Sequence, residues 1–181
     1  INNFYKAFDS LGCITSHVDL FKRTIKLKEH INKQDIVFVG GGNTKSMLAV
    51  WRDWGLDLIL KEAYESGTIM SGVSAGAICW FEKGITDSWS NKLNLLDCLS
   101  FTEGACCPHY DEEADRKPAL TEFIMNDNID ECFAIEGGCA LHIKNDVVYK
   151  AVSFKQDKNS LVVKKENNKI TESILPKISL L

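Results

Sequence analysis

The stretch from Thr68 to Trp80, TIMSGVSAGAICW, decides the fold. Its first half is a short apolar run that predicts a buried strand, and its second half predicts a helix. The G-x-S-x-G pattern lies between them, over residues 72–76. In this pattern a serine occupies a sharp strand-to-helix turn, and small neighbours keep side chains away from the turn. We therefore predict that Ser74 is a nucleophile; a helix-capping serine in a tight turn is the alternative.

The residues around this stretch alternate between helical and extended patterns. Strands are predicted at 13–20, at 36–39 (IVFV) and at 68–73, and helices at 4–11, 27–32, 43–51 and 56–65. Short apolar strands that alternate with helices predict a mostly parallel sheet with helices on both faces. Further along, short apolar runs at 133–135, 140–143, 147–149 and 161–163 are separated by Gly-Gly, Asn-Asp and Asn-Asn turns. These runs predict antiparallel hairpins on the edge of the sheet, within a single domain, 1–181.

Composition excludes several classes of function. The net charge is -4 and no block of basic residues occurs, which argues against nucleic acid and anionic membranes as partners. No apolar run is long enough to span a bilayer. Seven cysteines lie mostly within apolar runs, which favours a reduced, cytoplasmic compartment. Cys106, Cys107 and His109 could form a metal cluster, but no CxxC pair supports that interpretation.

The general base is predicted from the four histidines of the chain. His109 follows an apolar run and lies in a loop that Pro108 restrains, and such loops carry site residues in open α/β sheets. We therefore predict that His109 is the base. Three carboxylates compete to orient it, and their positions alone leave the choice open: Asp87, Asp111 and Glu136.

Two further features complete the predicted site. Gly40-Gly41-Gly42 follows a strand but lacks the spacing of a phosphate-binding loop, so it is better explained as an oxyanion-hole donor beside the Ala75 N–H. Arg116 opens a predicted helix, where a cation needs an anionic partner. That partner is either an acid at 111–115 or the carboxylate of a substrate.

Five motifs together resemble the dipeptidase E (alpha-aspartyl dipeptidase) family in their order and spacing: VGGGNT (39–44), SGVSAGA (71–77), TDS (86–88), CPHYD (107–111) and DR (115–116). The resemblance covers roughly residues 1 to 155. It implies a class I glutamine-amidotransferase-like, flavodoxin-like three-layer fold. It also implies cleavage of small peptides with N-terminal aspartate, without metal or organic cofactor. The family begins with a strand that this sequence lacks, so we expect the natural chain to carry a further N-terminal segment.

The resemblance also assigns roles to residues. It implies that Ser74 is the nucleophile, that His109 is the base and that Asp87 orients it. It implies oxyanion donors at Ala75 and at Gly41 and Gly42, and it aligns Arg116 with an arginine that pairs with the substrate's aspartyl carboxylate. It leaves open whether the protein is a monomer or a homodimer.

Alternative functions remain at this stage. One is a serine hydrolase for isoaspartyl or other small peptides, similar to cyanophycinases. Another is a non-catalytic binding protein of the same fold. An ordinary α/β-hydrolase is disfavoured because its acid and histidine follow much later strands. A glutamine amidotransferase is disfavoured because Ser74 stands where that class uses cysteine.

Overall fold

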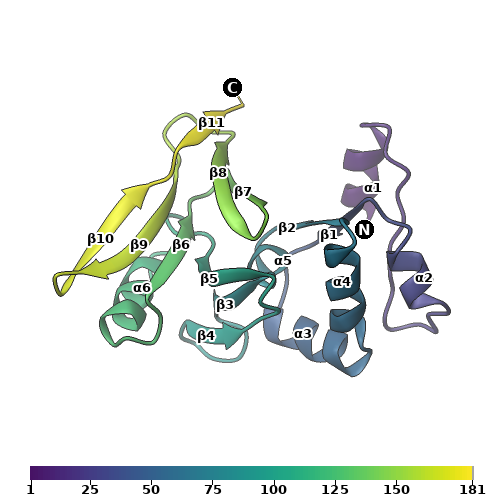
Figure 1. Ribbon diagram of the computed structural model, residues 1–181, viewed down its shortest axis with the longest axis horizontal. Helices are drawn as coiled ribbons and strands as arrows, with labels where there is room; N and C mark the ends of the chain where they lie inside the picture. Colours follow the sequence, from purple (N-terminus) through teal and green to yellow (C-terminus); the bar gives the residue numbers. More distant parts are fainter. Residues whose placement is uncertain (181) are drawn as a thin grey trace.

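The computed structural model describes residues 1–180 (Figure 1). Its helices are α1 (Asn2–Asp9), α2 (Leu27–Ile31), α3 (Thr44–Asp53), α4 (Leu56–Glu65), α5 (Ala75–Ile78) and α6 (Arg116–Met125). Its strands are β1 (Ile36–Val39), β2 (Ile69–Gly72), β3 (Phe81–Thr86), β4 (Asn94–Asp97), β5 (Thr102–Cys107), β6 (Glu131–Ile135), β7 (Cys139–Lys144), β8 (Val147–Ser153), β9 (Ser160–Glu166), β10 (Lys169–Ile174) and β11 (Lys177–Ser179).

The strands form three sheets. β1 and β2 pair in parallel, six strands follow the order β10-β9-β6-β5-β3-β4, and three strands follow the order β11-β8-β7. The centre of the six-stranded sheet is parallel, because β5 pairs in parallel with both β3 and β6. The architecture is therefore mixed α/β with parallel portions. Two antiparallel hairpins, β7–β8 and β9–β10, confirm part of the predicted C-terminal pattern. The pattern was wrong in two respects: β6, the predicted strand at 133–135, pairs in parallel with β5, and β7 and β8 belong to a separate sheet. The finer prediction of a glutamine-amidotransferase-like fold stays a prediction.

Strand β1 has helices on both of its faces, because successive side chains of a strand point to opposite sides. Phe38 packs against Phe8 of α1, with 5.5 Å between the ring centroids. Val39 points the other way and is buried with Leu48 of α3 and Leu60 of α4. This arrangement fixes the carboxyl end of β1, from which the glycine loop at 40–42 emerges.

The strand predicted over 13–20 is absent from the sheets, and this corrects the prediction. Residues 13–19 have no regular secondary structure, and within residues 1–180 β1 pairs only with β2. The segment is held by side chains instead: the Tyr5 hydroxyl lies 2.8 Å from His17 Nδ1, and Thr15 donates to Asp9. An apolar, extended pattern becomes a strand only where a neighbouring strand accepts its backbone hydrogen bonds.

The buried cysteines belong to the packed core. Five of the seven are buried, and burial raises the pKa of Cys98 and of Cys107 to about 12. Such thiols stay protonated and pack as small apolar groups. Across the described residues, 1–180, no group of three or more His, Cys, Asp or Glu side chains is arranged to hold a metal ion. In the same range, no helix is both long and apolar enough to cross a membrane.

Candidate active site

The turn that carries Ser74 is strained. β2 ends at Gly72, α5 begins at Ala75, and Ser74 between them has φ 56° and ψ -116°. A non-glycine residue holds such a conformation only where its surroundings enforce it. The two glycines of the motif are required by space. A Cβ on Gly72 would lie 2.2 Å from the Gly76 carbonyl oxygen, and one on Gly76 would lie 2.1 Å from the carbonyl oxygen of Val39. Close backbone packing therefore shapes the turn.

The histidine predicted from sequence lies against this serine. His109 follows β5 and Pro108, and its Nε2 lies 3.1 Å from Ser74 Oγ. His109 also has a positive φ, 56°. Both residues sit at the carboxyl ends of parallel strands, where sites form in open α/β sheets. The structure thus places the predicted nucleophile and the predicted base within hydrogen-bonding distance.

Glu112 occupies the other side of the imidazole ring. His109 Nδ1 lies 2.9 Å from Glu112 Oε2. The two residues share a tight turn in which the His109 carbonyl oxygen accepts the N–H groups of Glu112 and Glu113. With Nδ1–H donating to the carboxylate, Nε2 is free to accept the Ser74 proton. Sequence reasoning missed Glu112. Its i,i+3 spacing from His109 in a turn was the available signal.

None of the three carboxylates predicted to orient His109 is the one that contacts its Nδ1 within residues 1–180. Asp87 is exposed after β3, and the next residue, Ser88, is tied to the glycine loop because Asn43 Nδ2 donates to its carbonyl oxygen at 2.6 Å. Asp111 accepts the Gly137 N–H at 2.8 Å. Glu136 accepts the N–H of Asn159 at 2.8 Å. The structure therefore differs from the predicted Ser74-His109-Asp87 arrangement: the carboxylate that contacts His109 Nδ1 belongs to Glu112.

We expect Glu112→Gln to lower kcat about 10²- to 10⁴-fold, because the amide removes the charge that stabilises the imidazolium and permits the wrong tautomer. Asp87→Asn serves as the matched change and should retain most of the parent rate. Steady-state hydrolysis of a chromogenic peptide substrate measures both. The reverse ranking of the two variants would return the orienting role to Asp87.

Of the predicted oxyanion donors, Gly41 and Ala75 lie beside Ser74. A Cβ on Gly41 would lie 3.3 Å from Ser74 Cβ and 3.8 Å from Ser74 Oγ, so the backbone of this loop passes directly beside the nucleophile. Gly42 has φ 152°, which a side chain would strain. The Ala75 N–H lies in the first turn of α5, where no intrahelical acceptor exists. Asn43, next along the chain, caps α3 by accepting the Ser46 N–H at 2.9 Å.

Arg116 is buried, and its guanidinium group is occupied within the protein. Its Nε lies 2.8 Å from Glu113 Oε2, its second terminal nitrogen lies 2.7 Å from the same oxygen, and its NH1 donates to the Ile85 carbonyl oxygen at 2.7 Å. Only 4% of the residue is exposed. Of the two partners considered from sequence, the structure supplies the acid at 113 and braces the start of α6 against β3.

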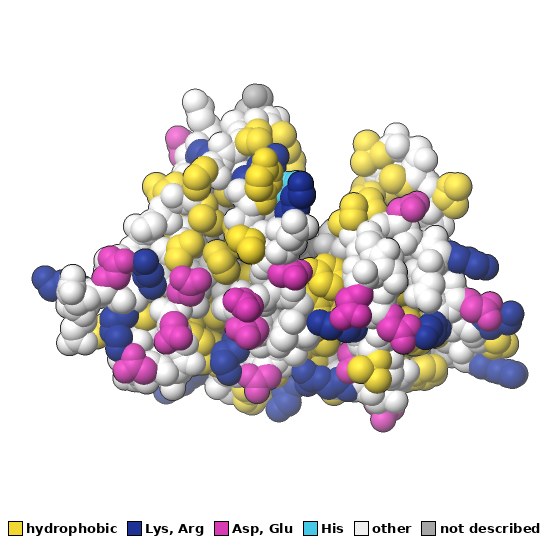
Figure 2. Space-filling model, in the orientation of Figure 1, with side chains coloured by type: hydrophobic (Ala, Val, Ile, Leu, Met, Phe, Trp, Pro, Cys, Tyr) yellow, Lys and Arg dark blue, Asp and Glu magenta, His cyan; other side chains and the backbone are white. Residues whose placement is uncertain are grey.

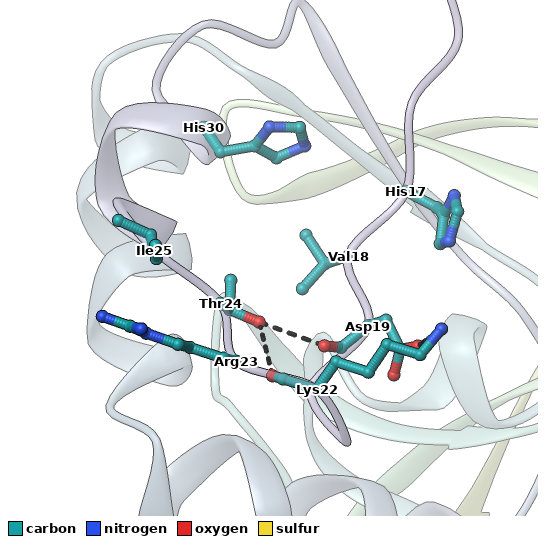
Figure 3. A pocket seen from close by; sticks show the side chains of 8 residues that line it. All are labelled: His17, Val18, Asp19, Lys22, Arg23, Thr24, Ile25 and His30. Carbon is teal, nitrogen blue, oxygen red and sulfur yellow. Dashed lines mark hydrogen bonds and ion pairs between the residues drawn. The ribbon is translucent and has the colours of Figure 1, made fainter.

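A separate hollow of about 350 Å³ is lined by residues between His17 and His30 (Figure 3). Thr24 Oγ1 donates to the carbonyl oxygens of Asp19 and Lys22 across it. The Lys22 ammonium lies 3.2 Å from the Asp19 carboxylate. None of its lining residues belongs to the set around Ser74.

The geometry around Ser74 defines a class of protein. The serine lies on a strained strand-to-helix turn, one nitrogen of a histidine ring is within hydrogen-bonding distance of its hydroxyl, and a carboxylate contacts the other ring nitrogen. This is the arrangement of a serine hydrolase. Sequence comparison gives the family. A family model described as peptidase family S51 matches residues 1–150. The chain belongs to peptidase family S51 and is a serine-type peptidase.

The relatives agree with this assignment. The chain is 43% identical over 177 residues to an uncharacterized peptidase, YgaJ, of Bacillus subtilis (strain 168), covering 97% of this chain and 76% of that protein. It is 28% identical over 134 residues to a peptidase E of Pasteurella multocida (strain Pm70), covering 67% of this chain and 56% of that one. A crystal structure of a provisionally assigned peptidase E protein from Listeria monocytogenes EGD-e superposes with a TM-score of 0.57 at 19% identity, covering 94% of this chain and 75% of that chain.

Proposed function

We propose that this peptidase is an exopeptidase that hydrolyses small peptides with N-terminal aspartate through an acyl-enzyme on Ser74. The observation that carries the proposal is the chain of contacts from Ser74 Oγ to His109 Nε2, at 3.1 Å, and from His109 Nδ1 to Glu112, at 2.9 Å. The preference for aspartate rests on the resemblance to the dipeptidase E family and on the relatives named peptidase E.

The first half of the reaction transfers the peptide's acyl group to the enzyme. His109 Nε2 takes the proton of Ser74 as Oγ attacks the peptide carbonyl carbon, and Glu112 stabilises the resulting imidazolium. The carbonyl oxygen gains negative charge and is held by the N–H groups of Ala75 and the 41–42 loop. The C–N bond then breaks, and His109 donates its proton to the leaving amine.

The second half releases the acyl group. His109, now neutral again, takes a proton from a water molecule as the water oxygen attacks the ester carbonyl. The same backbone donors hold the new oxyanion. When the ester C–O bond breaks, His109 returns a proton to Ser74 Oγ, and the carboxylate product leaves. Each proton therefore passes through one ring nitrogen, which requires that Nδ1 keep its bond to Glu112.

We expect the parent to release p-nitroaniline from aspartyl-p-nitroanilide at least about tenfold more efficiently than from leucyl-p-nitroanilide, in kcat/KM, which corresponds to about 1.4 kcal/mol of transition-state discrimination. No turnover of aspartyl substrates by folded protein would contradict the proposed substrate class.

The variant Arg116→Ala tests the role of that arginine. A fall in kcat/KM for the aspartyl substrate alone supports a role in binding the substrate carboxylate. An equal fall for both substrates supports a structural role through the ion pair with Glu113.

A further inference from the structure

The C-terminal residues lie beyond the part of the chain that matches the family model, which ends at residue 150. They form β9, β10 and β11, and β11 lies beside β8 (Figure 1). Lys177, the first residue of β11, points its ammonium group at the loop between β8 and β9. It donates to the carbonyl oxygens of Gln156 and Lys158, at 2.9 Å each, and to Asn159 Oδ1 at 3.0 Å. One side chain therefore bonds three acceptors within residues 156–159 of this loop.

That loop contacts the segments that flank the active site. The Lys158 ammonium pairs with the Asp111 carboxylate. Asn159 and Glu136 bond twice: the Asn159 N–H donates to Glu136 Oε2 at 2.8 Å, and the Glu136 N–H donates to the Asn159 carbonyl oxygen at 3.1 Å. The 156–159 loop thus joins the turn after His109 to the end of β6.

The segment that carries His109 is restrained through the same residues. Asp111 also accepts the Gly137 N–H at 2.8 Å, and the Tyr110 N–H donates to the Ile135 carbonyl oxygen at 3.0 Å. Partial burial alone would raise the pKa of Asp111, but the bonds from Lys158 and Gly137 outweigh it and hold that pKa below its usual value. Asp111 is therefore a charged anchor two residues from His109, whose positive φ needs such support.

We propose that the C-terminal segment positions the catalytic histidine: Lys177 orders the 156–159 loop, and Lys158 in that loop fixes Asp111 and with it the turn from His109 to Glu112. The inference rests on the role proposed for His109. Lys158 and Lys177 are positioning residues, since they act through the loop and not on the substrate. A displacement of about 1 Å at the base is enough to cost about 10²-fold in rate.

The test compares Lys158→Met and Lys177→Met with Lys164→Met. The control lysine is similarly exposed and also ion-paired, with Glu166, but lies on β9. We expect a fluorophosphonate to label Ser74 about 10- to 100-fold more slowly in the first two variants, with urea midpoints close to the parent. We expect Lys158→Arg to restore most of the rate, because arginine can still pair with Asp111. Hydrogen exchange in residues 107–113 should rise in the two slow variants only.

The two readouts separate this inference from the proposed function. Labelling of Lys158→Met and Lys177→Met at the rate of Lys164→Met overturns the inference while leaving Ser74 as nucleophile. Absence of labelling in the folded parent overturns the proposed function. In that case hydrogen exchange at residues 107–113 alone tests whether the C-terminal segment holds the His109 turn. If the two lysine variants exchange at the parent rate there, the positioning inference is overturned as well.

Discussion

Ser74→Ala is expected to abolish peptide hydrolysis, with kcat falling about 10⁴- to 10⁶-fold and KM changing little. The hydroxyl is the only group that the mechanism joins covalently to the substrate, and it lies 3.1 Å from the base. Alanine leaves the turn and the backbone donors in place, so substrate binding and the fold should survive. Release of p-nitroaniline under saturating substrate measures kcat, and fluorophosphonate labelling reports the nucleophile directly.

Ser71→Ala is the matched control for this change. Ser71 lies three residues earlier in β2, and its hydroxyl donates to the Val37 carbonyl oxygen at 3.0 Å. Losing that bond should cost about 1 kcal/mol of stability without slowing the reaction. If Ser74→Ala kept more than about a hundredth of the parent kcat, a different group would be the nucleophile.

Gly76→Ala is expected to destabilise the fold by about 3 kcal/mol or more and to stop labelling of Ser74. The added Cβ would lie 2.1 Å from the Val39 carbonyl oxygen, which is backbone and cannot rotate away. The β1 strand, α5 or both must shift, and Ser74 moves with them. Urea denaturation followed by tryptophan fluorescence measures the loss in free energy of unfolding.

Gly40→Ala provides the comparison. Gly40 directly follows Val39, the last residue of β1, and its φ is not positive. A Cβ added to Gly40 would meet no other part of residues 1–180 within 4 Å. We expect this variant to stay within about 0.5 kcal/mol of the parent. Equal stability of Gly76→Ala and Gly40→Ala would mean that the close approach between the turn and β1 is not a feature of the protein in solution.

The turn at Ser74 could be predicted from sequence because its determinants are local. A strand, two glycines and a helix occupy thirteen consecutive residues, 68–80, and together they indicate one sharp strand-to-helix turn. The placement of His109 was also predictable, because Pro108 and the preceding strand put it at the carboxyl end of a strand. The Asn43 cap follows from the same kind of local chemistry.

The partner of the histidine could not be read in this way. The loops that carry the acidic residues near this site follow the carboxyl ends of three neighbouring parallel strands, β3, β5 and β6. Side-chain contacts between loops depend on how the loops turn, so the sequence does not decide among the four carboxylates there: Asp87, Asp111, Glu112 and Glu136. Only the structure shows that the turn after His109 folds back so that Glu112 reaches Nδ1. The extended pattern at 13–20 failed for a related reason, because strand formation depends on a neighbour that local sequence does not specify.

The space-filling view shows a surface hollowed between the three-stranded sheet and the lobe that contains α1 (Figure 2). The close approach of Gly76 to Val39 has a consequence for the proposed site. The Val73 N–H also donates to the Val39 carbonyl oxygen, at 3.0 Å, so the nucleophile and the loop after β1 are joined backbone to backbone. These contacts hold the two segments together before any ligand binds. Under the proposed mechanism, the backbone donors would then be in place from the start, and selection between peptides would depend more on the fit of a rigid site than on closure around the ligand.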